Sequence, residues 1–253
     1  MSATFLELVA VGLLAGSFGA VLGVGGGIIL VPGLILVAGL PFHTAVGASL
    51  VCVVATSVAG SAVYLRTGRV DLGVGVRLQL YTVLGAVTAG LAAVYVPVAP
   101  LYLAFALLLL ITAFRMWPRA HAVAPPHDVA HERRPLAAGA SVGAGAVAGL
   151  LGVGGGVLNV PILHLLLGMP FDRSVATSVY MIGVTAAGAA LVYLARGDVA
   201  LGIAGVAMIG TLAGAGVAAL VGGKLPQRAL KLIFALLLVY VAFRMGSRGL
   251  AAF

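Results

Sequence analysis

Long apolar runs follow one another along the chain, separated by short polar stretches. Four windows of about 20 residues, the length of a membrane-crossing helix, lack charged residues: 44–65, 78–97, 174–194 and 199–221. Strands of a buried parallel sheet are also continuously apolar, but they last roughly 4–8 residues. The pattern therefore predicts an all-α polytopic membrane protein.

The first apolar run, residues 5–40, is too long for one crossing, since as a single helix it would extend about 54 Å. Its centre reads GVGGG at 23–27, with Pro32 shortly after. Each glycine inside a helix costs about 1 kcal/mol relative to alanine, so three in succession favour a break. We expect two shorter arms, residues 5–22 and 28–40.

The first half of the sequence returns in the second half at an offset of 129 residues, without a gap. Gly23–Gly27 then correspond to Gly152–Gly156, Pro32 to Pro161, and the AFRM tetrapeptide at 113 to the one at 242. Such a repeat predicts two homologous membrane halves. We assign residues 1–116 to the first repeat, 117–135 to a polar linker and 136–253 to the second repeat.

Further spans at 44–65, 72–96 and 100–114 give five membrane-embedded segments per half, and an odd number inverts the second half relative to the first. A parallel arrangement with four crossings per half is also tolerable, but it places four basic residues outside the cytoplasm: Arg173, Lys224, Arg228 and Lys231. Basic residues prefer the cytoplasmic side, so inversion is favoured. With the linker cytoplasmic, the inverted arrangement places these basic residues inside: Arg66, Arg69, Arg115, Arg119, Arg133, Arg134, Arg173, Lys224, Arg228 and Lys231.

Composition agrees with a membrane protein and limits its chemistry. Only 8% of residues are charged, against about 25% in soluble domains. The net charge of +8 comes from basic residues at segment ends, so no nucleic-acid partner is expected. Cys52 is the only cysteine, and prolines surround the linker histidines His121, His127 and His131. We therefore expect neither a metal site nor a cofactor.

The glycine breaks call for a functional explanation, because backbone groups freed in lipid cost several kcal/mol each unless they face protein or water. A helix that restarts after a break presents unpaired N–H donors and a partial positive charge, which suits an anion. In transporters with inverted repeats, broken helices meet near the bilayer midplane around the substrate. The alternative is that these glycines only permit close helix packing. The candidate binding glycines are Gly25, Gly26, Gly27, Gly154, Gly155 and Gly156.

The embedded polar residues also favour an anion. None of the acidic residues lies deep within a predicted span, whereas cation and proton pathways usually contain such carboxylates. Hydroxyls in spans can instead bond their own helix backbone. Arg77, inside the third long span, either reaches toward the interface or balances substrate charge. Besides Arg77, the candidate side chains are Asn159, Ser49, Ser178, Thr56 and Thr185.

The repeated segments GSFGAVLGVGGGIILVP at 16–32 and GAVAGLLGVGGGVLNVP at 145–161 resemble the sulfite exporter TauE/SafE family. The resemblance implies a multi-pass permease of the bacterial inner membrane for sulfur-containing anions such as sulfite, thiosulfate or an organosulfonate. No ATP-binding phosphate loop is present, which favours a secondary transporter. Proton or ion coupling and homo-oligomerisation stay open.

Two other functions stay open beside the secondary transporter, and the embedded residues argue against a third. One is a passive anion channel or uniporter, and another is a membrane scaffold that does not transport. An intramembrane enzyme would need embedded ligands or a nucleophile, yet His164 is the only embedded histidine and no carboxylate accompanies it at ligand spacing. We therefore expect no enzyme.

Overall fold

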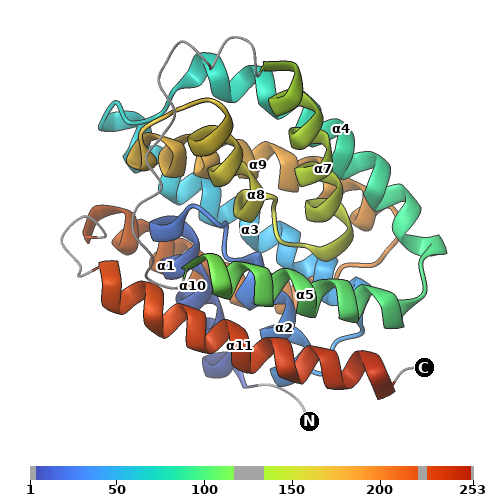
Figure 1. Cartoon of the computed structure of the whole chain (residues 1–253). Helices are drawn as coiled ribbons and strands as arrows, with labels where there is room; N and C mark the ends of the chain where they lie inside the picture. The colour runs from blue at the N-terminus through green and yellow to red at the C-terminus, as the bar shows by residue number, and fades with distance from the viewer. Residues whose placement is uncertain (1–3, 117–133, 222–226, 252–253) are drawn as a thin grey trace.

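The computed structural model describes residues 4–116, 134–221 and 227–251, and within them it contains helices and no strand. Figure 1 shows their arrangement. The helices of the first half are α1 (Phe5–Leu22), α2 (Gly27–Val37), α3 (Phe42–Arg66), α4 (Leu72–Ala92), continued by a 3₁₀ turn (Ala93–Tyr95), and α5 (Val98–Met116). Those of the second half are α7 (Arg134–Leu151), α8 (Gly156–Pro161), continued by a π-helical turn (Ile162–Leu166), α9 (Phe171–Ala195), α10 (Leu201–Val221) and α11 (Gln227–Ala251).

The prediction of an all-α polytopic membrane protein is confirmed. Within the described ranges, six helical segments are long and apolar enough to cross a membrane: α1, α3, α4 with its 3₁₀ turn, α9, α10 and most of α11. The remaining apolar helices are shorter and include the arms that follow the two breaks. The predicted linker falls mostly on residues 117–133, which lie outside the described residues together with its three histidines, and α7 already begins at Arg134.

Local sequence explains several helix starts. The Thr4 side chain accepts the N–H of Glu7 at 3.4 Å, and the Glu7 carboxylate accepts the N–H of Thr4 at 2.9 Å, forming a capping box before α1. Asp71 caps α4 by accepting the N–H of Val74 at 3.0 Å. Pro41 and Pro170 precede α3 and α9, which begin at corresponding positions of the two halves.

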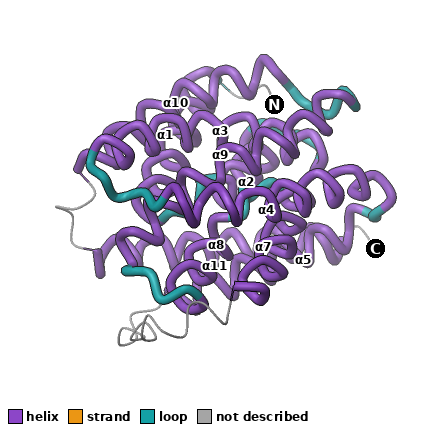
Figure 2. The backbone as a smooth tube through the Cα atoms, turned by 90° about the horizontal axis from the view of Figure 1, so that it is seen from above, coloured by secondary structure: helices purple, strands orange, loops and turns teal. Residues whose placement is uncertain are grey.

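The first helix of each half packs along the fourth helix of the other half. A Cβ atom at Gly16 in α1 would lie 2.8 Å from the Cα of Thr211 in α10, and one at Gly145 in α7 would lie 2.9 Å from the Cα of Thr82 in α4. Small residues let the helix backbones approach closely, as is common in membrane proteins. The pairs α1–α10 and α4–α7 therefore hold the two halves together (Figure 2).

The third helices of the two halves run in opposite directions. α3 and α9 pack antiparallel, because Gly60 near the end of α3 contacts Val179 near the start of α9, while Gly47 contacts Tyr193 near the end of α9. As a result, α9 begins beside the loop between α3 and α4, where the N–H of Asp71 donates to the Thr177 hydroxyl at 3.0 Å.

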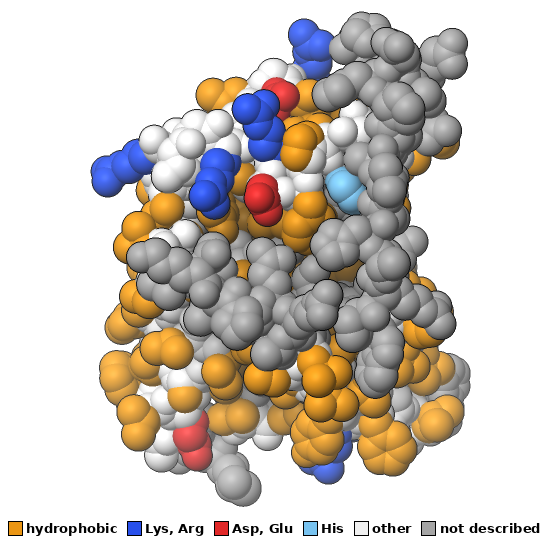
Figure 3. All heavy atoms as spheres, turned by 60° about the vertical axis from the view of Figure 1, so that its left-hand side comes forward, with side chains coloured by type: hydrophobic (Ala, Val, Ile, Leu, Met, Phe, Trp, Pro, Cys, Tyr) orange, Lys and Arg blue, Asp and Glu red, His pale blue; other side chains and the backbone are white. Residues whose placement is uncertain are grey.

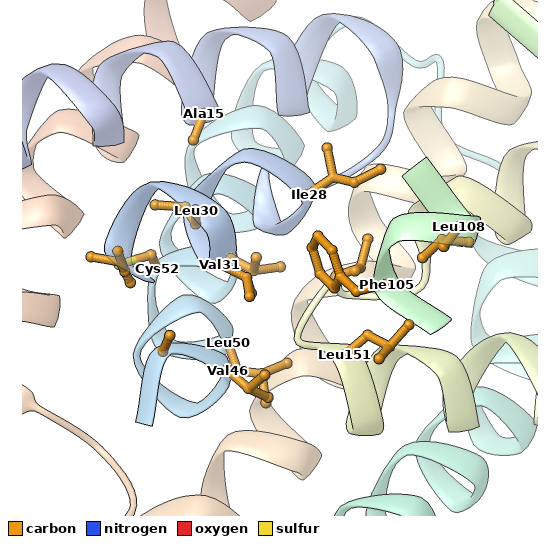
Figure 4. Close-up of a cluster of buried hydrophobic side chains, with 14 of the residues drawn as sticks. Ala15, Ile28, Leu30, Val31, Val46, Leu50, Cys52, Phe105, Leu108 and Leu151 are labelled. Atoms are coloured by element: carbon orange, nitrogen blue, oxygen red, sulfur yellow. The ribbon is translucent and has the colours of Figure 1, made fainter. Parts of the chain in front are cut away.

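The fifth helices, α5 and α11, form an antiparallel pair beside the main group of helices, with Gly249 of α11 against Tyr102 of α5. Ring contacts join this pair to the rest: Phe42 lies 4.9 Å from Tyr102, and Phe18 stacks on Phe234 at 5.0 Å between ring centroids. Figure 4 shows side chains of α5, among them Phe105, beside those of α2, α3 and α7 in one buried apolar cluster.

Charged side chains lie away from the core. Among the residues whose burial is described, which leave out 115–116, 134, 221 and 227–231, no Asp, Glu, Lys, Arg or His is buried. In the face shown in Figure 3, acidic and basic side chains gather in the upper part, and hydrophobic side chains cover much of the lower part. Arg66, Arg69 and Arg173 are all exposed at the end where α3 finishes and α9 begins.

Candidate functional site

The two glycine breaks meet in the interior of the protein. All residues of the breaks, Gly23–Gly27 and Gly152–Gly156, are buried. A Cβ atom at Gly27 would lie 2.8 Å from the Cα of Val153, and one at Gly156 would lie 2.8 Å from the carbonyl carbon of Val24. Each break therefore contacts the backbone of the other, which brings the predicted glycines of both halves together.

The glycines serve both backbone conformation and packing. Gly26 and Gly155 precede α2 and α8 with φ of +79° and +81°, in the left-handed region that favours glycine. Gly27 and Gly156 lack positive φ but contact the opposite break. The close-packing alternative thus accounts for these last two positions, and the break geometry requires the others.

The predicted serines connect each half to the break of the other half. Ser49 Oγ donates to the carbonyl oxygen of Gly152 at 2.9 Å, and Ser178 Oγ donates to that of Gly23 at 2.9 Å. Both hydroxyls are fully buried. They supply partners for carbonyl groups that the end of a helix leaves free. Their hydrogen-bonding role in this structure is therefore to support the breaks.

Two tyrosines add matching support that we did not predict. Tyr64 donates from its hydroxyl to the carbonyl oxygen of Ala20 at 3.1 Å, and Tyr193 donates to that of Gly149 at 2.9 Å. Their only signal in the sequence is the VYL tripeptide that recurs at the 129-residue offset. Each bond secures the last turn of the helix before a break.

The predicted threonines bond their own helices. Thr56 Oγ1 donates to the carbonyl oxygen of Cys52 at 3.2 Å, and Thr185 Oγ1 donates to that of Met181 at 3.0 Å. The Thr185 hydroxyl also lies 2.7 Å from that of Thr82, which links α9 to α4. The alternative of backbone bonding therefore describes both predicted threonines in this structure.

Two branched apolar side chains lie between the breaks. A Cβ atom at Gly154 would lie 2.7 Å from Val53 Cγ1 of α3 and 2.8 Å from Ile182 Cγ2 of α9. One at Gly25 would lie 3.3 Å and 2.9 Å from the same two methyl groups. Val53 and Ile182 are fully buried and occupy corresponding positions of the two halves. They form an apolar contact at the centre, which we call the central pair.

Among the described side chains, His43, Ser61 and Gln79 each have one buried polar atom without a hydrogen-bond partner, and Asn159 has two. Asn159 is 1% exposed, and neither its Oδ1 nor its Nδ2 has a hydrogen-bond partner among the described residues. Its Nδ2 lies 3.7 Å from the position that a Cβ atom would take at Gly155. An unsatisfied buried polar group costs about 1–3 kcal/mol. This amide is therefore suited to form hydrogen bonds with a bound ligand.

The remaining candidates lie elsewhere or make structural contacts. Arg77 is exposed on α4, so the structure does not bring it to the buried breaks. His164 Nδ1 lies 2.7 Å from the carbonyl oxygen of Met169. Among the described residues, no group of three His, Cys, Asp or Glu side chains could hold a metal ion.

Comparisons with known proteins agree with this architecture. A probable membrane transporter protein, YunE of Bacillus subtilis (strain 168), is 24% identical over 274 residues, which cover 98% of this chain and 99% of that protein. No solved structure matches the chain significantly. The family model for the sulfite exporter TauE/SafE matches residues 8–245. The chain therefore belongs to the sulfite exporter TauE/SafE family and is a membrane transporter.

Proposed function

We propose that this transporter is a secondary permease of the bacterial inner membrane for a small sulfur-containing anion, such as sulfite, thiosulfate or an organosulfonate. The observation that carries the proposal is the unpartnered amide of Asn159, buried next to the point where the two breaks meet. Membership of the family supports the substrate class.

The available hydrogen-bond donors suit an anion. In the second break, the N–H groups of Val153 and Gly154 have no acceptor among the described residues. No described carboxylate is buried near them to repel an anion. A small oxyanion, which accepts several hydrogen bonds, matches this environment.

Access to the breaks requires movement of the central pair. Val53 and Ile182 occupy the space between Gly25 and Gly154, so an anion that passes between the halves must displace them. The antiparallel course of α3 and α9 fits halves inserted in opposite orientations, which in other transporters rock around a central site. The end with Arg66, Arg69 and Arg173 then faces the cytoplasm.

The test is anion flux in proteoliposomes that contain the purified full-length chain. Vesicles are loaded with sulfite, thiosulfate, sulfate or sulfoacetate, with and without a pH gradient. Selective flux that a gradient stimulates supports a coupled permease, and selective flux that no gradient changes supports a uniporter or channel. Absence of flux for every anion, with folded protein in the vesicles, refutes the proposal.

A further inference from the structure

The two breaks repeat in sequence but differ in their backbone hydrogen bonds. In the first break, the N–H groups of Val24 and Gly25 donate to the carbonyl oxygen of Gly19 at 3.1 and 3.3 Å. In the second break, the corresponding N–H groups belong to Val153 and Gly154, and neither has an acceptor among the described residues. The second break therefore keeps donors free that the first break uses internally.

The side chains behind the breaks differ in the same direction. Asn159 follows the second break, and the corresponding residue after the first break is Leu30. Both are buried, at 1% and 0% exposure. Leucine fills its site without any need for a partner, whereas the amide of asparagine requires several hydrogen bonds and has none among the described residues.

The space beside the two N-cap glycines differs as well. A Cβ atom at Gly26 would lie 2.5 Å from the carbonyl oxygen of Ala15 and 3.0 Å from its carbonyl carbon, so α1 lies tightly against the first break. At Gly155, the nearest atoms would be the carbonyl oxygen of Ala144 and the Cβ of Ala148, both at 3.4 Å, an ordinary contact distance. The looser side is the one that faces the Asn159 amide.

We infer that the anion binds at the second break alone, held by the Asn159 amide together with the N–H groups of Val153 and Gly154, and that the first break is a structural counterpart. This inference rests on the proposed function and specifies its site. All of these donors are uncharged, so the hydrogen bonds are charge-assisted only because the ligand is an anion. Asn159 is then the residue that sets affinity for the anion.

A purely structural role for Asn159 makes the opposite prediction for stability. If the amide supported the fold, its replacement by leucine would destabilise the protein. If the amide instead binds a ligand, Asn159→Leu removes an unsatisfied group, and the variant should be at least as stable as the wild type when no anion is bound. The volume-conserving change Leu30→Met, at the corresponding position of the first half, is the matched control.

The experiment measures thermal unfolding and anion binding of the purified full-length chain in detergent, with sulfite, thiosulfate and sulfate as probes. We expect the wild type and Leu30→Met to be stabilised equally by the bound anion. We expect Asn159→Leu to keep or raise its melting temperature without anion and to bind the anion about 10- to 100-fold more weakly, the loss of one or two hydrogen bonds to a charged group. Wild-type affinity in Asn159→Leu, or a lower melting temperature without anion, overturns the inference.

A second variant tests the same position through charge instead of through the loss of hydrogen-bond donors. Asn159→Asp keeps the shape but places a carboxylate among the donors, so we expect it to reject the anion, whereas wild-type affinity in this variant overturns the inference. The result for the wild type separates the two levels of the proposal. If the wild type binds none of the three anions, the proposed function fails and the inference with it. If the wild type and Asn159→Leu bind equally, the inference alone fails.

Discussion

The two halves of this transporter share their supporting contacts but not the polar group behind the break. Ser49 and Ser178 bond the opposite break at the same distance, and Tyr64 and Tyr193 secure the helices before the breaks in the same way. Asn159, however, corresponds to Leu30. Contacts that recur in both halves are those that the fold requires twice. Asn159 departs from the repeat at 1% exposure, beside Gly155 of the break, and has both polar atoms of its side chain unsatisfied, so we assign this difference to the ligand.

We expect the largest effect on folding when the contact between the two glycine breaks is disturbed. The two halves can then be compared by changing one break at a time. Gly27→Val and Gly156→Val each force a branched side chain into the backbone of the opposite break. Overpacking that no flexible side chain can relieve costs about 3 kcal/mol or more. We expect both variants to lose the peak of folded protein in fluorescence-detected size-exclusion chromatography.

Gly216→Ala is the matched control, because a Cβ atom at this α10 position meets nothing within 4 Å. It should be neutral or stabilise the helix by about 0.5–1 kcal/mol. If only one of the two break variants failed to fold, the breaks would not support each other equally, and their structural equivalence would be wrong.

A truncation in the central pair should have the next largest effect on stability. Ile182→Ala removes a fully buried side chain that contacts Gly25 and Gly154. A cavity from this change costs about 2–5 kcal/mol. Because the removed atoms lie between the breaks, we also expect faster anion leak in proteoliposomes. Met181→Leu, a buried neighbour whose volume is conserved, should leave the leak unchanged. An equal leak in both variants would mean that Ile182 does not obstruct the path.

Helix positions followed from local properties of the sequence. The break after Leu22 was predictable because the conformational cost of consecutive glycines is local. The predicted second arm, 28–40, ends earlier, since α2 finishes at Val37 and Gly39 adopts φ of +68° in the turn that follows. The start of the arm, at Gly27 instead of Ile28, lies within the usual uncertainty of helix ends, whereas the end is earlier because of this turn.

The partners of the site residues were less accessible from the sequence. Ser49 and Ser178 bond residues 103 and 155 positions away, so no single helix indicates their acceptors. Arg77 was a candidate because its position along α4 is inside the predicted span, but its exposure depends on how α4 is rotated about its axis. In a membrane protein both the lipid face and the packed face of a helix are apolar, so hydropathy hardly distinguishes them.

The serines provide a smaller and matched pair of tests. Ser49→Ala and Ser178→Ala each leave a buried break carbonyl without its donor, at a cost of about 1–3 kcal/mol. We expect similar decreases in melting temperature for the two variants. Anion affinity should fall more in Ser49→Ala, because its acceptor is Gly152 of the second break, where we place the ligand. An equal loss of affinity in both variants would favour binding at both breaks.

The smallest expected effect concerns another difference between the halves. Arg196 pairs with Asp198 at 2.8 Å after α9, whereas the corresponding residues of the first half, Thr67 and Arg69, cannot form an ion pair with each other. The Arg196 and Asp198 side chains are 21% and 32% exposed, so solvent screens the pair and Asp198→Asn should cost at most about 1 kcal/mol. The loss should shrink in high salt during thermal unfolding. Anion affinity should stay at the wild-type value, because both members of this pair already satisfy each other, unlike the Asn159 amide. The contrary outcome is a fall in affinity as large as that of Asn159→Leu. It would show that a sequence difference between the two halves can mark a functional residue even where no buried group is unsatisfied.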